Sequence, residues 1–305
     1  MNMDKTTSFI PKATVPTLIL VFIQCLLFTN TACSQDTKPI HLPFIMTEDG
    51  HTLIKATING VEGNFIFDTG AGLNLLTKTF VDSIGNLEKT DGFYTAFRAT
   101  GEKVQVDLWR AGHVEIGAYE LEKEIFSVYD IDIPLAGLIS LTAFKNAPIT
   151  IDYEDKVLVV ESDESVEKRI KKSKAVIPVQ ISKEQGKTLG ISTSVLLDNK
   201  LTLHVKLDSG AGFDVYRFNA RYMAPLGIDS TQVEHEYKQS IFKPKEGNDY
   251  YYTKIPEMST LNGEIETGDL NATFIDGLIY EGIMGINWLG DKITIDILNE
   301  RLIIN

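Results

Sequence analysis

Residues 67–72 read FDTGAG, and residues 207–212 repeat the pattern as LDSGAG. In each copy an acidic residue follows an apolar run, a hydroxyl residue comes next, and two glycines flank an alanine. Asp68 and Asp208 lie 140 residues apart. Glycines allow a tight turn and a close approach of the backbone to a bound molecule, so both loops are candidate binding elements. The loops consist of Asp68, Thr69, Gly70, Ala71 and Gly72 and of Asp208, Ser209, Gly210, Ala211 and Gly212.

Further landmarks repeat downstream of each loop in the same order. GLI at 137–139 precedes ITID at 149–152, and GIM at 282–284 precedes ITID at 293–296. The repeat intervals are 145 and 144 residues. Three ordered landmarks at nearly one interval predict that the chain consists of two lobes built on the same plan.

A polar stretch separates the two predicted lobes. Residues 161–174 read ESDESVEKRIKKSK, with only Val166 and Ile170 apolar, which indicates a solvated linker or a short exposed helix. The expected divisions are a leader at 1–32, an N-terminal lobe at 33–160, the linker at 161–174 and a C-terminal lobe at 175–305.

Local patterns within the lobes favour β-strands. Residues 201–207 alternate between apolar and polar, as a strand with one buried face does, and 105–108 and 113–116 show the same alternation. Helical spacing is limited to 75–84 and, less clearly, 215–223. Short alternating runs with glycine turns and few helices predict the all-β class.

The doubled loop also predicts a chemistry. Backbone N–H groups in such a turn can point at a carboxylate and stabilise its charged form. Two matching loops would bring Asp68 and Asp208 face to face. Adjacent carboxyl groups do not both ionise readily, so one keeps a proton while the other is charged. Such a pair can supply both the acid and the base of a hydrolysis that uses water as nucleophile.

The residues quoted above resemble the active-site loops of the retropepsin-like and pepsin-like aspartic proteases, and the repeat resembles bacterial aspartyl proteases with two retropepsin-like repeats. In that superfamily two apolar residues and a glycine follow on a strand beneath each loop. Residues 283–285, Ile-Met-Gly, match this second element. Residues 138–140, Leu-Ile-Ser, depart from it, because Ser140 replaces the glycine and puts close packing behind Asp68 in doubt.

The resemblance implies two β-barrel lobes related by a pseudo-two-fold axis, with Asp68 and Asp208 as the catalytic pair. Thr69 and Ser209 would hydrogen bond across the lobe interface, and the loop glycines would leave room for the turn and the substrate. A hairpin flap would cover the substrate, with candidate tips at 97–101 and 245–248 chosen from turn composition. Because water is the nucleophile in that superfamily, no metal and no organic cofactor are expected.

These features predict an aspartic-type endopeptidase, a hydrolase acting on peptide or protein substrates. The alternative is a non-catalytic cell-envelope lipoprotein that keeps the protease fold and only binds a peptide or another ligand. A dinucleotide-binding reading of the G-x-G pairs is poor, because Leu75 and Val215 stand where the third glycine should be. A monomer with lobes paired within one chain is favoured over a homodimer.

Composition and charge limit the classes of molecule that the protein is expected to bind. The chain of 305 residues is 43% hydrophobic and 23% charged, which is ordinary for a globular protein. Its formal net charge of −13 argues against nucleic acid as a partner and against an anionic membrane surface as a docking site. We therefore expect contact with a membrane through a lipid anchor only.

The N-terminus has the pattern of an export signal. Residues 15–28 are almost all apolar, shorter than the ~20 residues that cross a bilayer, and follow a segment with two lysines. Small residues then precede Cys33, which resembles the lipidation site of a bacterial lipoprotein. Both cysteines of the chain lie within this region, so the body has no disulfide framework. We expect an exported protein, anchored by lipid in the bacterial cell envelope on the periplasmic or outer-membrane face.

Overall fold

The computed structural model describes residues 38–240, 243 and 245–305. The expected leader at 1–32 and the lipidation site at Cys33 lie outside the described residues. Within the described part of the chain, no helix combines the length and the apolar character needed to span a membrane.

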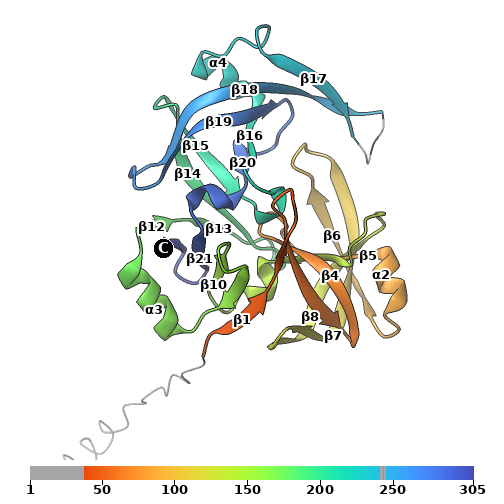
Figure 1. The fold of residues 1–305 in the computed structure, drawn as a ribbon. Helices are drawn as coiled ribbons and strands as arrows, with labels where there is room; N and C mark the ends of the chain where they lie inside the picture. The colour runs from red at the N-terminus through yellow and green to blue at the C-terminus, as the bar shows by residue number, and fades with distance from the viewer. Residues whose placement is uncertain (1–37, 241–242, 244) are drawn as a thin grey trace, which may run out of the picture. The chain divides into compact units, whose positions relative to one another are not determined.

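One eight-stranded sheet is formed by residues of the N-terminal half, which we define as 38–160. Its strands, in spatial order, are β2 (Ile45–Met46), β3 (Thr52–Ile58), β4 (Val61–Asp68), β9 (Gly137–Ser140), β5 (Asn74–Thr77), β8 (Tyr119–Tyr129), β7 (Lys103–Ile116) and β6 (Glu88–Phe97). An additional pairing of β3 with β7 curls the sheet on itself (Figure 1).

A second eight-stranded sheet is formed by the C-terminal half, defined as 175–305, and repeats the first strand for strand. Its strands, in spatial order, are β13 (Gln180–Ser182), β14 (Gly190–Leu197), β15 (Leu201–Leu207), β20 (Gly282–Met284), β16 (Tyr216–Asn219), β19 (Glu266–Ile275), β18 (Gly247–Thr260) and β17 (Glu234–Gln239). The extra pairing is also repeated, because β14 contacts β18 as β3 contacts β7.

A six-stranded sheet takes three strands from each half. Its strands, in spatial order, are β1 (Ile40–Pro43), β11 (Val157–Val160), β10 (Ile149–Asp152), β21 (Lys292–Asp296), β22 (Arg301–Ile304) and β12 (Ala175–Pro178). The two repeated ITID segments pair with each other in antiparallel register, with Thr150 opposite Thr294. The order is therefore the same when read from either edge, as a two-fold relation between the halves requires.

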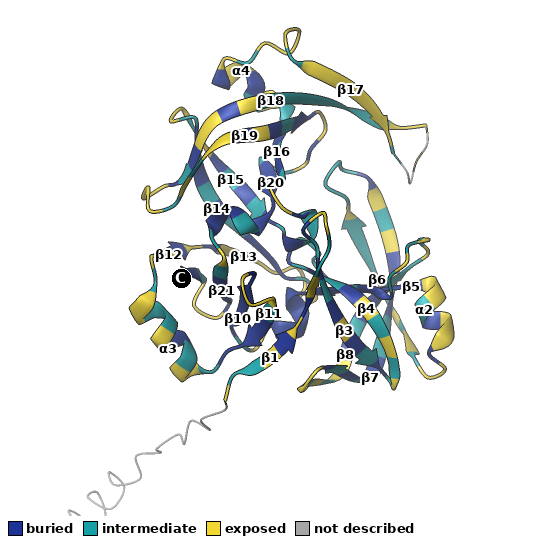
Figure 2. Ribbon diagram, in the orientation of Figure 1, coloured by how far each residue is buried: buried dark blue, intermediate teal, exposed yellow. Residues whose placement is uncertain are grey.

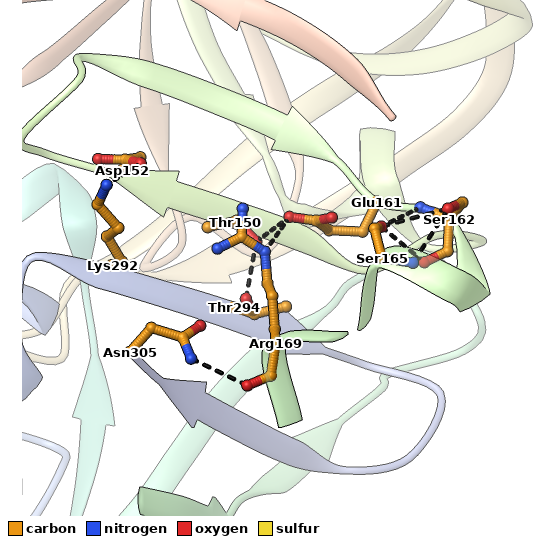
Figure 3. A network of polar contacts seen from close by, with 9 residues as sticks. All are labelled: Thr150, Asp152, Glu161, Ser162, Ser165, Arg169, Lys292, Thr294 and Asn305. Carbon is orange, nitrogen blue, oxygen red and sulfur yellow. Dashed lines mark hydrogen bonds and ion pairs between the residues drawn. The ribbon is translucent and has the colours of Figure 1, made fainter. Parts of the chain in front are cut away.

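A polar network crosses the centre of this sheet (Figure 3). The hydroxyl groups of Thr150 and Thr294 are 2.7 Å apart, and Thr150 donates to a carboxylate oxygen of Glu161 at 2.5 Å. The Glu161 side chain is 1% exposed and also accepts from Arg169 Nε at 2.5 Å. A buried carboxylate is costly unless it is paired and hydrogen bonded, and both conditions are met here.

The helices of the described residues are few and short. They are α2 (Lys78–Ser83), α3 (Asp163–Lys172), α4 (Met223–Leu226) and the 3₁₀ turns η1 (Leu141–Phe144), η2 (Ser209–Ala211), η3 (Ala220–Tyr222) and η4 (Ile286–Leu289). The helix α3 lies in the stretch 161–174, where a linker or exposed helix was expected, and Ser162 and Ser165 form a capping box at its start. The boundaries of the two lobes stay a prediction.

The helix expected over 75–84 is wrong in its first half. Leu75 and Leu76 belong to β5, which pairs with β8 and β9, and the helix begins only at Lys78. Thr77 caps that helix by accepting from the backbone N–H of Phe80. Pairing with strands far away in the sequence overrides the local helical spacing.

The second helical expectation, over 215–223, is also largely wrong. Tyr216–Asn219 form β16, which lies between β19 and β20 in the sheet. Helical turns follow only as η3 and α4. The same local pattern thus gives a strand followed by a short helix in both halves.

The predicted all-β class is confirmed. Burial follows the sheets, and the four inner strands of the six-stranded sheet are largely buried, whereas β17 is exposed along its whole length (Figure 2). The core is rich in phenylalanine and branched aliphatic side chains, which suits strands packed on both faces. Among the largest fully buried side chains are Phe65, Phe67, Phe126, Phe144, Phe218 and Phe274.

Candidate functional site

The two glycine loops begin where equivalent strands end. Asp68 is the last residue of β4, and Asp208 follows β15 directly. The strands β9 and β20 run parallel beside them, with Ser140 opposite Asp68 and Met284 opposite Leu207. Each carboxyl group therefore sits on a strand that is braced by a second strand of its own half.

Reciprocal hydrogen bonds lock the two loops together. The backbone N–H of Thr69 donates to Ser209 Oγ at 3.0 Å, and that of Ser209 donates to Thr69 Oγ1 at 2.9 Å. Each hydroxyl also donates to a carbonyl of the other half, Thr69 to Leu207 at 3.0 Å and Ser209 to Phe67 at 2.9 Å. Both hydroxyl residues are buried, so these four bonds fix the spacing of the neighbouring aspartates.

The carboxyl group of each aspartate lies against the glycine of the opposite loop. A Cβ atom added to Gly70 would clash with the Asp208 carboxyl group, and one added to Gly210 would clash with that of Asp68. Glycine is needed at both positions because the two loops approach each other so closely. The structure thus brings Asp68 and Asp208 together, as the doubled motif predicted.

The two carboxyl groups differ in their backbone contacts. Oδ1 of Asp68 accepts the N–H groups of Gly70 and Ala71, both at 2.8 Å. Oδ1 of Asp208 accepts one, from Gly210 at 2.8 Å, because the N–H of Ala211 goes to the Asp208 backbone carbonyl. Donors aimed at a carboxylate stabilise its charged form, so Asp68 is the better placed of the two to carry the negative charge.

The pKa of Asp208 is raised well above its usual value. Burial is the main cause, and the negative charge of Asp68 and a hydrogen bond to its carboxyl group add to it. The nearby cation of Lys206 and the N–H of Gly210 oppose this shift in the pKa. A raised pKa favours the protonated form of the Asp208 carboxyl group.

Ser140, the one departure from the family pattern, fits behind the first loop. It is fully buried, its N–H donates to Asn74 Oδ1 at 2.8 Å, and its hydroxyl lies 2.7 Å from that of Thr142. At the matching position of the C-terminal half, the N–H of Gly285 donates to a backbone carbonyl instead, that of Val215. The hydroxyl group of Ser140 is thus hydrogen bonded, and the serine is accommodated where the second element of the pattern has glycine.

The aspartates line a cleft of about 780 Å³. Its walls come from both halves, and both contribute aliphatic side chains, but polar side chains are more frequent on the C-terminal side. The N-terminal side includes Leu75, Val104, Val106, Ile131, Ile133 and Leu138, and the C-terminal side includes Gln180, Ser182, Ser192, His204 and Lys206. A cleft of this size, mostly apolar with a few polar groups, is typical of a ligand site.

Two hairpins meet over this part of the molecule. The hairpin of β6 and β7 turns at 98–102, as expected from turn composition, and the backbone carbonyl of Ala99 accepts from the N–H of Ile279 at 2.9 Å. Glu102, on the turn, is 8% exposed and accepts hydrogen bonds from Thr100 and from Ser240. Ser240 follows β17, whose hairpin with β18 contains the second expected tip at 245–248.

Sequence reasoning missed two polar residues that line the cleft. Tyr94, on β6, donates its hydroxyl group to Glu184 of the C-terminal half, and burial together with this carboxylate raises its pKa to about 12. Lys206 donates from Nζ to the carbonyl of Gly70 at 2.6 Å. A signal for Lys206 was available, because it stands two residues before Asp208 and residues at i and i+2 of a strand share a face.

This arrangement has the parts of a general acid–base site. One carboxyl group accepts two backbone N–H groups, the pKa of its neighbour is raised, and both open on a cleft. Such a pair can take a proton from water and give one to a carbonyl oxygen.

Comparison with known proteins agrees with the motif in the N-terminal half. Residues 54–143 match the model of a family described as aspartyl protease. The matched segment contains the loop of Asp68 and the strand that ends at Ser140. The chain is therefore similar to the aspartyl protease family over this segment.

A solved structure is also similar to part of the chain. It is the crystal structure of a retropepsin-like aspartic protease from Rickettsia conorii, with 26% sequence identity and a TM-score of 0.32, and the match covers 40% of this chain and 89% of that one. No curated protein matches the sequence.

Proposed function

We propose that the protein is an aspartic-type endopeptidase in which Asp68 and Asp208 activate a water molecule for attack on a peptide bond. One observation carries the proposal. Two carboxyl groups from matching loops lie together in a cleft, each against the glycine of the other loop, and burial and the neighbouring carboxyl group together raise the pKa of Asp208.

The asymmetry of the two carboxyl groups assigns their roles. Asp68, with two backbone donors on Oδ1, is the charged base that removes a proton from the attacking water. Asp208, whose pKa is raised, is the acid that donates its proton to the carbonyl oxygen of the substrate. After attack Asp68 holds the proton, Asp208 is charged, and the substrate is a tetrahedral diol. Asp68 then gives its proton to the amine nitrogen as the C–N bond breaks, and Asp208 takes a proton from a hydroxyl group of the diol as the new carbonyl forms, which restores the pair.

The substrate is proposed to be an extended peptide. β6 is the last strand of its sheet, so one row of its backbone groups is available to pair with a peptide. Tyr94 and Ala96 of this strand line the cleft. The β6–β7 hairpin thus has the place and the edge that a covering flap needs.

A single chain is proposed to be competent, because it supplies both loops and all four hydrogen bonds between Thr69, Ser209 and their partners. Sedimentation at micromolar concentration checks this, and activity that rises with the square of protein concentration would contradict it.

The location of the protein is a separate proposal, based on residues 1–33 alone. We propose an exported lipoprotein of the cell envelope whose lipid is carried by Cys33. Cys33→Ser should abolish acylation and release the protein from the membrane fraction. Unchanged acylation of that variant would contradict the proposal.

The decisive test uses the purified chain, a mixed peptide library and a series of acid to neutral pH values. Asp68→Asn and Asp208→Asn should each lower kcat by about 10³-fold or more, since a member of a cooperating pair is lost. Asp163→Asn, an exposed position in the first turn of α3, is the matched control and should leave kcat unchanged. Cleavage that survives both active-site changes would end the enzyme proposal.

The alternative of a binding protein without catalysis makes a different prediction for the same variants. Peptides would bind to wild type and to Asp68→Asn alike, and no product would form at any pH. Ser140, whose departure from the glycine of the pattern is compatible with this alternative, is accommodated by hydrogen bonds.

A further inference from the structure

The two walls of the cleft are not equivalent, although the halves that build them have the same strand order. Lys206 stands two residues before Asp208 on β15, and the residue two before Asp68 on β4 is Ile66. The C-terminal wall therefore carries a cation at the position where the N-terminal half has an aliphatic side chain.

Lys206 is held in the cleft by neutral groups. Its Nζ donates to the carbonyl of Gly70 at 2.6 Å and lies 5.1 Å from the ring centroid of Tyr280. Among the described residues, no carboxylate forms an ion pair with it within 4.0 Å. An ammonium group has three donors, so it can offer further hydrogen bonds to a bound molecule.

The other charged groups of the cleft are occupied. Glu184 accepts the hydroxyl of Tyr94, and Arg98 is paired with Glu102 at 3.0 Å. The half-buried Lys206, in a chain of net charge −13, thus forms no ion pair within 4.0 Å among the described residues, although its charge acts on Asp208 from a greater distance. A charge in such a place favours ligands of the opposite sign.

We infer that Lys206 makes the cleft selective for peptides that carry an acidic side chain beside the scissile bond. This inference rests on the proposed peptidase function and names its substrate class. The aliphatic N-terminal wall accepts an apolar side chain on one side of that bond, and the Lys206 ammonium group accepts a carboxylate on the other. A charge-assisted hydrogen bond in a partly desolvated cleft is stronger than a neutral one.

The test compares peptides that differ only as Glu or Gln, which have the same shape, at each position around the cleavage point. For wild type, kcat/KM should be roughly tenfold higher for Glu at one of these positions. Lys206→Met should reduce the ratio to about one, Lys206→Arg should keep it, and Lys206→Glu should invert it. Lys55→Met, at a surface lysine paired with Glu62, is the matched control and should not change the ratio.

Because the result is a ratio within one variant, partial loss of activity does not affect it. Binding of the same peptide pairs with the scissile amide reduced supplies the ratio even where a variant no longer cleaves. A ratio near one at every position in wild type, or one that Lys206→Met leaves unchanged, would overturn the inference. Failure of the proposed function is distinct, because no cleavage dependent on Asp68 and Asp208 would then be seen with any peptide.

Discussion

Thr150 and Thr294, 144 residues apart in the chain, share a hydrogen bond of 2.7 Å where β10 pairs with β21. Each belongs to one copy of the repeated ITID segment, and each is opposite the other in the register. Identical residues that face each other across an antiparallel pair lie beside the two-fold axis that relates the halves. The centre of the six-stranded sheet is thus a contact between equivalent positions of the repeat.

The first prediction concerns this contact and the stability of the fold. Thr150→Val removes the hydroxyl that donates to Glu161 and leaves a buried carboxylate with one partner fewer. The free energy of unfolding should fall by about 1–3 kcal/mol, measured by urea denaturation. Thr294→Val, which loses only the Thr150 contact, should cost less, and Thr202→Val on an exposed strand position should cost least. Equal losses for the three variants would contradict this reading.

The second prediction concerns the bonds between the two loops. Thr69→Val removes the hydroxyl that donates to Leu207 and accepts from the N–H of Ser209. Both the free energy of unfolding and kcat should fall, the latter because the two carboxyl groups lose their fixed spacing. Thr69→Ser keeps both bonds and is the control.

Ser209→Ala should have the same effect from the other side of the interface, because each hydroxyl supports the other loop. The two changes act on one network, so their effects on stability should not add. Additive losses in a double-mutant cycle would show that the two loops are held independently.

The third prediction is a dependence of stability on pH that comes from Asp208. Its pKa is raised in the folded state, so the folded protein keeps this proton more firmly than the unfolded chain does. The resulting stability is present in acid, below the ordinary pKa of an aspartate, and is lost as the pH rises through the raised pKa.

In Asp208→Asn the side chain at this position is neutral at every pH. The free energy of unfolding of this variant should therefore exceed that of wild type near neutral pH, and the difference between the two should shrink as the pH falls. Urea denaturation of both proteins over a pH series measures it. A difference in the free energy of unfolding that grows as the pH falls would contradict the prediction. The pH profile of kcat should fall on its alkaline side as Asp208 loses the same proton, because Asp208 acts as the acid. This fall is the alkaline limb of kcat.

The fourth prediction links Lys206 to that limb. The cation lowers the pKa of Asp208 from the higher value that burial and Asp68 would give. Lys206→Met should move the alkaline limb of kcat to higher pH, and Lys206→Arg should leave it in place. A limb that does not move in Lys206→Met would mean that the ammonium charge does not reach the dyad.

The fifth prediction concerns the contact between the two hairpins. Burial raises the pKa of Glu102. Hydrogen bonds from Ser240 and Thr100 and the charge of Arg98 together lower the pKa by more than burial raises it, so the net shift is downward. The contact is therefore present above this lowered pKa and weakens as the pH falls through it.

Ser240→Ala should accelerate hydrogen exchange at the Ile279 amide, which donates to the Ala99 carbonyl on the same turn, by several-fold. Ser192→Ala, at an exposed hydrogen bond elsewhere in the sheet, is the control. Unchanged exchange at Ile279 would show that the turn is held without Ser240.

The residues that could be predicted from the sequence are those that stand in a short motif that occurs twice in the chain. Asp68 and Asp208 stand in glycine loops, and a turn of that composition has few uses other than close approach. The fold class followed from alternation in single strands for the same reason. By contrast, Leu75 and Leu76 lie at helical spacing, and only their partners on β8 and β9, some fifty or more residues later, make them a strand.

Contacts between the halves were the part that the sequence could not supply. The repeated ITID segments indicated a duplication, yet nothing local states that the two copies pair with each other. The position of Lys206 on the face of Asp208 could be derived from strand periodicity, whereas its bond to Gly70 depends on how the second half docks on the first.

The shared sheet has a consequence for biosynthesis. β10 is complete once residue 152 has left the ribosome, but its neighbour β21 begins at residue 292. Until then the strand presents unpaired backbone groups, a template on which another nascent chain can pair. Translation of the second half is thus the step that closes this edge, and a holdase chaperone that shields β10 during that interval should raise the yield of native protein.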